Sequence, residues 1–213
     1  MPITSLSEWR QIRSRGTAST PQQTPTGYGG VLLNSGQMRF DVTAGDPGTE
    51  RGVMRSEIAG NPLPRYGRHG LRVTFMVPAF WAQDSGVFCL TAVPDPDDAV
   101  IHNSPLAVCI KGDRLRIAKR SDPNPASPPS ITPVTLGERQ LVAGRWHTLD
   151  LDMNLSWLGD GCLHASLDGK TLADDHGANC YNDQVPPFWC AGLYWWRSEG
   201  DPMALRVGEW ART

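Results

Sequence analysis

Residues 188–197 read Phe-Trp-Cys-Ala-Gly-Leu-Tyr-Trp-Trp-Arg, and this aromatic stretch is the strongest indication of the fold. In a β-strand alternate side chains point to opposite faces, which sends Phe188, Cys190, Gly192, Tyr194 and Trp196 to one face and the residues between them to the other. Both faces then carry large rings. One face suits a protein core, whereas the second, with a glycine gap in it, needs cover from another sheet, a partner or a ligand. Sugar rings commonly fill that role in all-β proteins.

The composition favours a single domain built mainly from strands. The chain has 213 residues, of which 39% are hydrophobic and 20% charged, enough for one large core and short for two. The 22 glycines and 18 prolines suit short strands joined by tight turns, so that helix is expected to be minor.

Short segments rich in strand-forming residues and bounded by Gly, Pro, Asn or Asp recur along the chain. They are residues 31–33, 37–43, 52–58, 71–77, 86–93, 106–110, 114–119, 145–154, 162–167, 170–173, 188–196 and 204–209. About a dozen strands at this spacing predict an all-β sandwich.

Turns and termini give the organisation of the chain. Lys111-Gly112-Asp113 and Asp168-Gly169 predict two hairpins, because glycine and aspartate tolerate turn conformations. Ser5 to Arg13 has the capping-box spacing of a short helix, followed by an extended arm, so we expect an appendage over residues 1–29 and one domain over 30–213. Residues 121–133 contain too many prolines to pair as an inner strand.

The charge balance argues against a general nucleic-acid binder. The 20 Lys and Arg face 22 Asp and Glu, a net charge of −2, whereas neutralising phosphates needs an excess of basic residues. Basic residues do gather between Arg51 and Arg72. This cluster suits an anionic polymer such as a uronic-acid polysaccharide, and it equally suits a solvated face whose charges are paired within the molecule.

No targeting segment stands out in the sequence. Residues 1–16 are charged and lack an apolar core, and no run approaches the roughly 18 apolar residues of a membrane span. We therefore expect no secretion signal and no membrane partner, which is compatible with the cytoplasm or with a virion. The five cysteines lack C-x-x-C pairs, which predicts buried free thiols. Asp150 and Asp152 together are only a weak signal for a cation site. We therefore expect neither a metal site nor a cofactor.

Three groups of residues are candidates for chemistry. Arg55 and Glu57 share one face of a predicted strand, either as an ordinary surface ion pair or as a site where Arg55 grips a carboxylate and Glu57 orients it. His147 is in register with core residues, a pattern more typical of a structural histidine than of a base. His102, at the edge of a loop before a strand, is the other candidate base.

Four motifs occur in the order seen in polysaccharide lyases with a β-jelly-roll fold. They are Arg55-Ser56-Glu57, Gly144 to Leu149, Leu167 to Lys170, and Phe188 to Tyr194. The chain thus resembles this family, which includes alginate lyases, glucuronan lyases and the heparin-lyase-like group, over residues 30–209. The resemblance implies a concanavalin-like β-jelly-roll sandwich of two antiparallel sheets, with Arg55, Glu57 and Tyr194 on a concave sheet.

The resemblance also implies β-elimination on an acidic polysaccharide. Such an enzyme neutralises the uronate carboxylate, removes the C5 proton and protonates the leaving O4. Arg55 would take the first role, His102 or His147 would be the base, and Tyr194 the acid or base. The implied substrate contacts are Glu57, Arg72, Trp196 and Arg197.

The chain departs from the family at two reactive positions. Phe188 and Cys190 stand where alginate-lyase-like members have a catalytic tyrosine and a lysine, and the glutamine-x-histidine signature is missing. Phenylalanine carries no transferable proton, and each general acid or base contributes about 10²- to 10⁴-fold. Two functions therefore remain open: a lyase, or a non-catalytic jelly roll that binds glycans or belongs to a larger assembly such as a phage virion. In an assembly, the N-terminal arm and residues 121–133 are the expected protein contacts.

Overall fold

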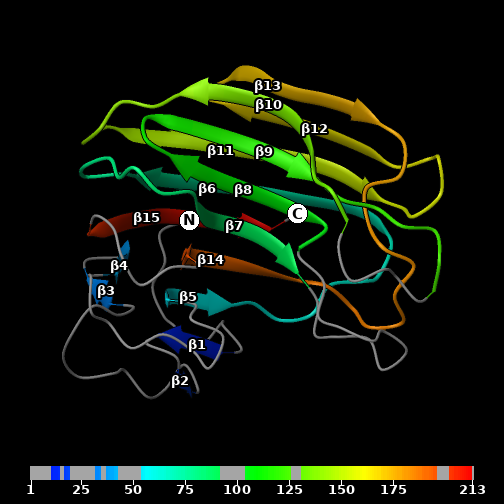
Figure 1. Cartoon of the computed structure of the whole chain (residues 1–213), viewed down its shortest axis with the longest axis horizontal. Helices are drawn as coiled ribbons and strands as arrows, with labels where there is room; N and C mark the ends of the chain where they lie inside the picture. The colour runs from blue at the N-terminus through cyan, green and yellow to red at the C-terminus, as the bar shows by residue number, and fades with distance from the viewer. Residues whose placement is uncertain are drawn as a thin grey trace.

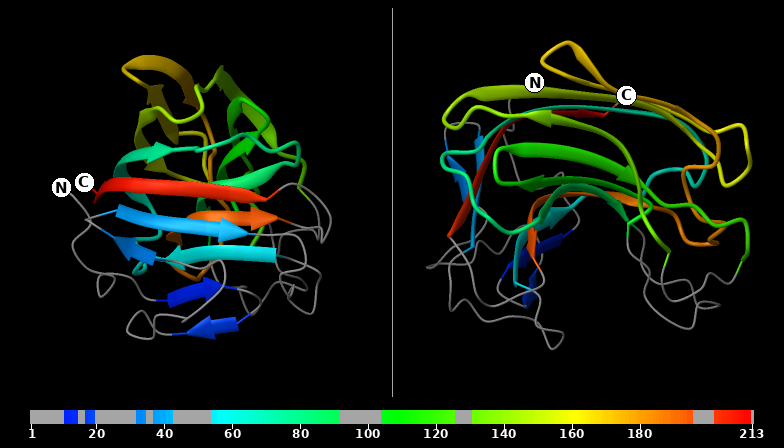
Figure 2. Two further views of the ribbon diagram at one scale, coloured as in Figure 1. Left: turned by 90° about the vertical axis from the view of Figure 1, so that its left-hand side faces the viewer. Right: turned by 45° about the horizontal axis from the view of Figure 1, so that its top comes forward.

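The computed structural model describes residues 11–14, 17–19, 32–34, 37–42, 54–91, 104–125, 131–195 and 202–212. These residues form two antiparallel β-sheets (Figures 1 and 2). The predicted all-β sandwich is confirmed, and the described residues contain no helix. Within this part of the chain there is accordingly no helix that is long and apolar enough to cross a membrane.

The two sheets are arched in the same direction, and the eight-stranded sheet lies on the inner side of the arch (Figure 2, right). This inner sheet has the order β10-β9-β8-β7-β14-β5-β1-β2. Its strands are β1 (Gln11–Ser14), β2 (Thr17–Ser19), β5 (Met54–Ala59), β7 (Ser85–Thr91), β8 (Leu106–Lys111), β9 (Arg114–Lys119), β10 (Val134–Gln140) and β14 (Phe188–Trp195).

The outer sheet has seven strands in the order β13-β12-β11-β6-β15-β4-β3. They are β3 (Leu32–Asn34), β4 (Gln37–Val42), β6 (Gly67–Met76), β11 (Trp146–Leu155), β12 (Cys162–Leu167), β13 (Lys170–His176) and β15 (Met203–Arg212). Strand β13 is thus an edge of the outer sheet, as β10 is of the inner sheet.

A hydrophobic core joins the facing sides of the two sheets. Phe75 of the outer sheet packs edge-on against Phe88 of the inner sheet, with ring centroids 5.5 Å apart. Trp189 and Trp210 make a similar contact across the sandwich at 6.5 Å. Edge-to-face aromatic pairs stabilise a core beyond the area they bury, so these two contacts hold β7 and β14 against the outer sheet.

Strand β11 shows why the alternating sequence gives a half-buried strand. Leu149, Leu151 and Met153 face the core and are at most 3% exposed. Asp150 and Asp152, between them, point to solvent, as alternation requires. The predicted orientation of this strand is confirmed.

Both predicted hairpins are confirmed. Gly112 turns between β8 and β9 with a φ of 57°. Asp168 and Gly169 connect β12 and β13 with φ values of 52° and 72°, the two positive angles of a type I′ turn.

The edges of the structure differ from the prediction in two places. Residues Gln11 to Arg13 belong to β1, which pairs with β5, and are not the end of a helix; residues 5–10 lie outside the described part. Strand β10 was not predicted, because it follows the proline-rich segment and its side chains are largely exposed. Within residues 121–133, Asp122 forms an isolated parallel bridge with Tyr181.

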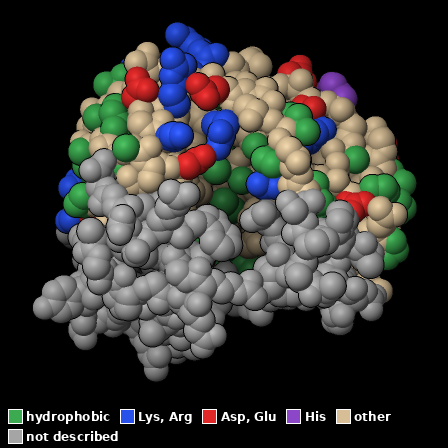
Figure 3. Space-filling model, in the orientation of Figure 1, with side chains coloured by type: hydrophobic (Ala, Val, Ile, Leu, Met, Phe, Trp, Pro, Cys, Tyr) green, Lys and Arg blue, Asp and Glu red, His purple; other side chains and the backbone are tan. Residues whose placement is uncertain are grey.

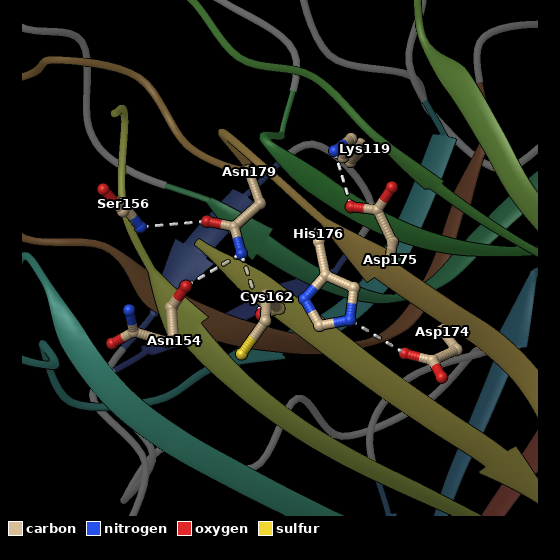
Figure 4. A network of polar contacts seen from close by, with 8 residues as sticks. All are labelled: Lys119, Asn154, Ser156, Cys162, Asp174, Asp175, His176 and Asn179. Carbon is tan, nitrogen blue, oxygen red and sulfur yellow. Dashed lines mark hydrogen bonds and ion pairs between the residues drawn. The ribbon is translucent and has the colours of Figure 1, made fainter. Parts of the chain in front are cut away.

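The side chain of one asparagine connects the end of β11 to the start of β12. The Asn179 side chain donates from Nδ2 to the carbonyls of Asn154 (2.9 Å) and Cys162 (3.0 Å), and its Oδ1 accepts from the Ser156 amide (3.0 Å) (Figure 4). Asn179 is 3% exposed. All of its polar atoms are therefore used, which fixes the start of β12.

Candidate functional site

The aromatic stretch that opened the sequence analysis forms β14, a central strand of the inner sheet. It lies between β7 and β5. The register pairs Tyr194 with Arg55 on β5, and Gly192 with Glu57. Residues far apart in the sequence, Arg55 with Glu57 and Gly192 with Tyr194, are therefore brought together at the middle of one sheet.

Both faces of β14 are buried over residues 188–193. Trp189, Ala191 and Leu193 belong to the main core and are at most 1% exposed. On the opposite face Phe188 and Cys190 form a small separate apolar cluster with Ala59. These two positions, where the resemblance implies a tyrosine and a lysine, are apolar and buried here, with exposures of 2% and 4%.

Gly192 is required because two backbones come unusually close. Its φ is 142°, and a Cβ atom built on it would lie 2.2 Å from the carbonyl oxygen of Ser56 and 2.5 Å from Glu57 Cα. No side chain fits there, since contacts below about 3 Å are repulsive. The glycine gap seen in the sequence thus serves the close approach of β14 to β5.

An irregularity in the sheet lies next to Tyr194. The pairing of β7 with β14 shifts between Ala191 and Tyr194, and Gly86 lies opposite Tyr194. Ser85 holds this point, because its hydroxyl accepts from the Tyr194 amide (3.3 Å) and lies 3.2 Å from the Tyr194 carbonyl. β-Bulges re-aim side chains and are common beside active sites. The Tyr194 side chain is half-buried.

Buried groups surround this point on the inner sheet. Glu57 is 5% exposed. Cys89 lies opposite Cys190 in the register, and burial, with contributions from Cys109 and Glu57, raises the pKa of the Cys89 thiol. Burial also raises the pKa of Cys109 to about 11. These thiols are protonated at neutral pH and supply no nucleophile. All five cysteines are free, two fully and three partly buried.

Farther along the same face, the charges are paired. Arg116 binds Asp84, and Arg114 lies 3.5 Å from Glu138. Figure 3 shows basic and acidic side chains side by side in the upper half of this view. The described part of this face is therefore mixed in charge. Sequence reasoning missed these pairs, because they join β9 to a loop and to an unpredicted strand.

The structure separates the two candidates on the outer sheet from the group around Tyr194. His147 lies on β11 and Arg72 on β6, both in the outer sheet. Arg72 pairs with Asp150 at 3.2 Å, and Arg68 pairs with Asp152 at 2.8 Å. The basic cluster was expected either to bind an anionic polymer or to be paired within the molecule, and these two arginines are paired within the molecule.

His147 is a structural residue of the outer sheet and not part of the candidate site. It is 3% exposed. Its Nδ1 lies 2.8 Å from the Asp168 carboxylate, and its Nε2 accepts from the Val142 amide at 3.1 Å. Both ring nitrogens are used inside the protein, so neither is available to a substrate. This geometry agrees with the structural role that the register of His147 with core residues indicated.

The remaining candidates fall outside the part of the chain that is described. His102, Trp196 and Arg197 lie in undescribed residues, and for Arg55 the backbone alone is described. The structure therefore assembles the candidate site from the register positions of Arg55, Glu57 and Tyr194.

The fold is an arched sandwich of two antiparallel sheets, and its central strand β14 pairs with β5, the strand that carries Arg55 and Glu57. These features define a β-jelly-roll protein of the polysaccharide-lyase type. The chain belongs to the polysaccharide lyase family, since the family model described as "Polysaccharide lyase" matches residues 2–206.

Solved structures share the fold at low sequence identity. They include an endo-β-1,4-glucuronan lyase from the fungus Trichoderma reesei, with a TM-score of 0.75, 15% identity, and coverage of 98% of this chain and 92% of that chain. An alginate lyase from Pseudomonas aeruginosa has a TM-score of 0.70 and 14% identity, covering 98% of this chain and 99% of that one. A marine alginate lyase from Zobellia galactanivorans has a TM-score of 0.60 and 12% identity, covering 98% and 96%. No curated protein sequence matches this chain.

Proposed function

We propose that this protein binds a uronate-containing polysaccharide on the concave face of the inner sheet and cleaves it by β-elimination. The observation that carries the proposal is the register of β14 with β5, which sets Tyr194 directly opposite Arg55 and Gly192 opposite Glu57. The similarity to a glucuronan lyase and to alginate lyases supports an acidic polymer as the substrate class.

The cross-strand arrangement matches the needs of the reaction. Directly opposed residues of an antiparallel pair have Cβ atoms about 4.5–5.5 Å apart, a distance that one sugar carboxylate and its C5 proton can span. An arginine at position 55 would neutralise the carboxylate bidentately, and so lower the barrier to removing the adjacent C5 proton. Glu57 would orient that arginine.

Tyr194 is the proton-transfer group of the proposal. In β-elimination the C5–H bond breaks, a C4=C5 double bond forms, and the C4–O4 bond breaks with a proton delivered to O4. A phenol both gives and receives a proton. Ser85 holds the Tyr194 backbone at the irregular point of the sheet, which fixes where the phenol starts.

One observation favours a second candidate, a glycan-binding protein without catalysis. Phe188 and Cys190 are apolar, buried and packed on Ala59 at the positions where relatives carry reactive groups. Losing one general acid or base lowers a rate by about 10²- to 10⁴-fold. In this second candidate the concave face keeps the polymer and leaves it intact.

A polymer panel separates these candidates. The protein is incubated at high loading with glucuronan, alginate and heparin, and the absorbance of the unsaturated product is followed. Retention of the same polymers in affinity electrophoresis is measured in parallel. A rise in absorbance supports the lyase, retention without a rise supports the binding protein, and the absence of both contradicts the proposal and its alternative.

Variants test the named residues. We expect Arg55→Gln to lower activity by at least about 10²-fold, because the carboxylate is no longer neutralised. Tyr66→Phe is the matched control, since Tyr66 is an exposed phenol held by Arg65 outside β14. Equal loss in both variants would contradict a specific site on the inner sheet.

A further inference from the structure

A cluster of three potential metal ligands lies on the outer sheet, away from the candidate site. His164 is on β12, and Asp174 and His176 are on the neighbouring edge strand β13. The register pairs His164 directly with Asp174, and Asp174 and His176 are two residues apart on the same face. All three side chains are exposed.

The donor atoms converge on one carboxylate oxygen. His164 Nδ1 lies 2.8 Å from Asp174 Oδ1, and His176 Nε2 lies 3.6 Å from the same oxygen. The two imidazole rings are edge-on with centroids 5.6 Å apart. One ligand atom from each residue lies within 4.8 Å of the other two. The contact of His176 with Asp174 is drawn in Figure 4.

These separations suit a tetrahedral ion. Zinc bonds of about 2.0–2.1 Å to nitrogen and oxygen place neighbouring ligand atoms about 3.3 Å apart. The distances of 2.8 Å and 3.6 Å to the Asp174 oxygen lie on either side of that value, and rotation of the exposed side chains can adjust them.

The strands that carry the ligands are held in place from elsewhere. Lys119 of the inner sheet binds Asp175, the residue between Asp174 and His176, at 2.5 Å. Asn179 binds the carbonyl of Cys162 at the start of β12. Figure 4 shows both anchors beside His176. A metal would therefore meet a backbone that is already arranged, so that only side-chain freedom is lost on binding.

One neighbouring acid on the same sheet is already engaged. Asp152, which lies opposite His164 in the register, is paired with Arg68. Cys162, a partly buried free thiol, lies opposite His176 in the register. An open hollow of about 820 Å³, lined by His164 and Asp174 among others, gives an ion access from solvent.

We propose that His164, Asp174 and His176 bind one divalent transition-metal ion, for which Zn²⁺ is the probe. Two imidazoles and one carboxylate favour zinc-like ions over Ca²⁺ or Mg²⁺, which prefer oxygen ligands only. Water completes the coordination. The bound ion cross-links edge strand β13 to β12, and it is independent of the proposed activity on the inner sheet.

The test is calorimetric titration of tag-free protein with Zn²⁺. We expect one saturable site per chain, and a visible absorption band when Co²⁺ is used in its place. His164→Gln and His176→Gln should each weaken Zn²⁺ binding by at least about tenfold, since each removes a direct ligand. Asp150→Asn, an acid on the same sheet face outside the cluster, is the matched control and should bind as the wild type does.

Thermal melts establish that each variant is folded. Because the substituted side chains are exposed, we expect the variants to fold. Zinc should raise the melting temperature of the wild type and of Asp150→Asn, and not that of the folded His164→Gln/His176→Gln double variant. An absence of saturable binding at millimolar Zn²⁺, or equal affinity in the double variant, would overturn the proposal. Neither result bears on polysaccharide cleavage.

Discussion

Gly192 illustrates how a single residue sets the spacing of the candidate site. Its φ of 142° and the 2.2 Å between a built Cβ and the Ser56 oxygen leave no room for any other residue. The sequence suggested a gap to be covered by another sheet, a partner or a ligand, whereas the glycine allows β14 to approach the backbone of β5. The reason lies in backbone packing, which a single sequence does not display.

We predict that Gly192→Ala destabilises the protein by at least about 2–3 kcal/mol, because the new methyl group meets backbone on the neighbouring strand. Denaturant unfolding measures the change. Gly144→Ala is the control: its φ of 74° also disfavours alanine, but nothing lies within 4 Å of the built Cβ. If both variants lose the same stability, the close contact at Gly192 is not the cause.

The buried cysteines give a second prediction. With pKa values of about 11 and about 12, Cys109 and Cys180 hold roughly 10⁻³ and 10⁻⁴ of their thiols as thiolate at pH 8. We expect both to resist iodoacetamide in the native protein and to react after unfolding. Mass spectrometry of the labelled peptides measures this, and rapid native labelling of Cys180 would contradict the burial described.

Asp168 gives a pH-dependent prediction. Burial opposes its ionisation, but the Thr148 amide, the hydrogen bond to His147 and the charge of Arg145 together hold its pKa below the ordinary value. A depressed folded-state pKa stabilises the protein above the unfolded pKa of about 4, and this stability is lost as the pH falls through the folded pKa.

Asp168→Asn should therefore cost about 2 kcal/mol at pH 7, since it removes charged hydrogen bonds, and less near pH 3. Asparagine tolerates the φ of 52° at this turn, so that the comparison reports on charge. Denaturant unfolding at the two pH values gives the difference. Asp113→Asn, at a partly exposed acid, is the control, and a loss that does not change with pH would exclude the electrostatic explanation.

At the scale of elements, the alternation of apolar residues and the residue types at turns were sufficient to predict most strands. The hairpins at Gly112 and at Asp168-Gly169 follow from local sequence alone. Strand β10 could not be predicted in this way, because its side chains are largely exposed and an edge strand needs no continuous apolar face. Strand β1 could not be predicted in this way either. Ser5 to Arg13 has the capping-box spacing of a helix, whereas pairing with β5 decides the conformation of Gln11 to Ser14.

The two sheets are also joined by an ion pair that sequence could not reveal. Lys119 on β9 and Asp175 on β13 are 13% and 20% exposed. We predict that Lys119→Met costs about 2 kcal/mol, because it leaves a largely buried carboxylate without its partner. Unfolding of the double variant Lys119→Met/Asp175→Leu should cost less than the sum of the single variants. Strict additivity would contradict a coupled pair.

At the scale of the whole molecule, the candidate site depends on pairing between distant segments. Arg55 and Tyr194 become neighbours only when β5 and β14 pair in the observed register. The sequence order of the motifs indicated the family, and the family match over residues 2–206 confirms it. Which candidates share a site was not predictable, because His147 fits the strand pattern equally well and yet lies in the other sheet.

Because positions 188 and 190 are apolar, the weight of the proposed chemistry rests on Tyr194. Phe188 and Cys190 are sealed in an apolar cluster, whereas Tyr194 is half-buried beside Arg55. The measurement that tests this most directly is the rate of unsaturated-product formation by the wild type and by Tyr194→Phe on the polymer that the panel selects. The account predicts a measurable wild-type rate and a loss of at least about 10²-fold in the variant, with polymer binding retained. Equal rates in the two proteins, or no product from the wild type on any acidic polymer, would contradict it.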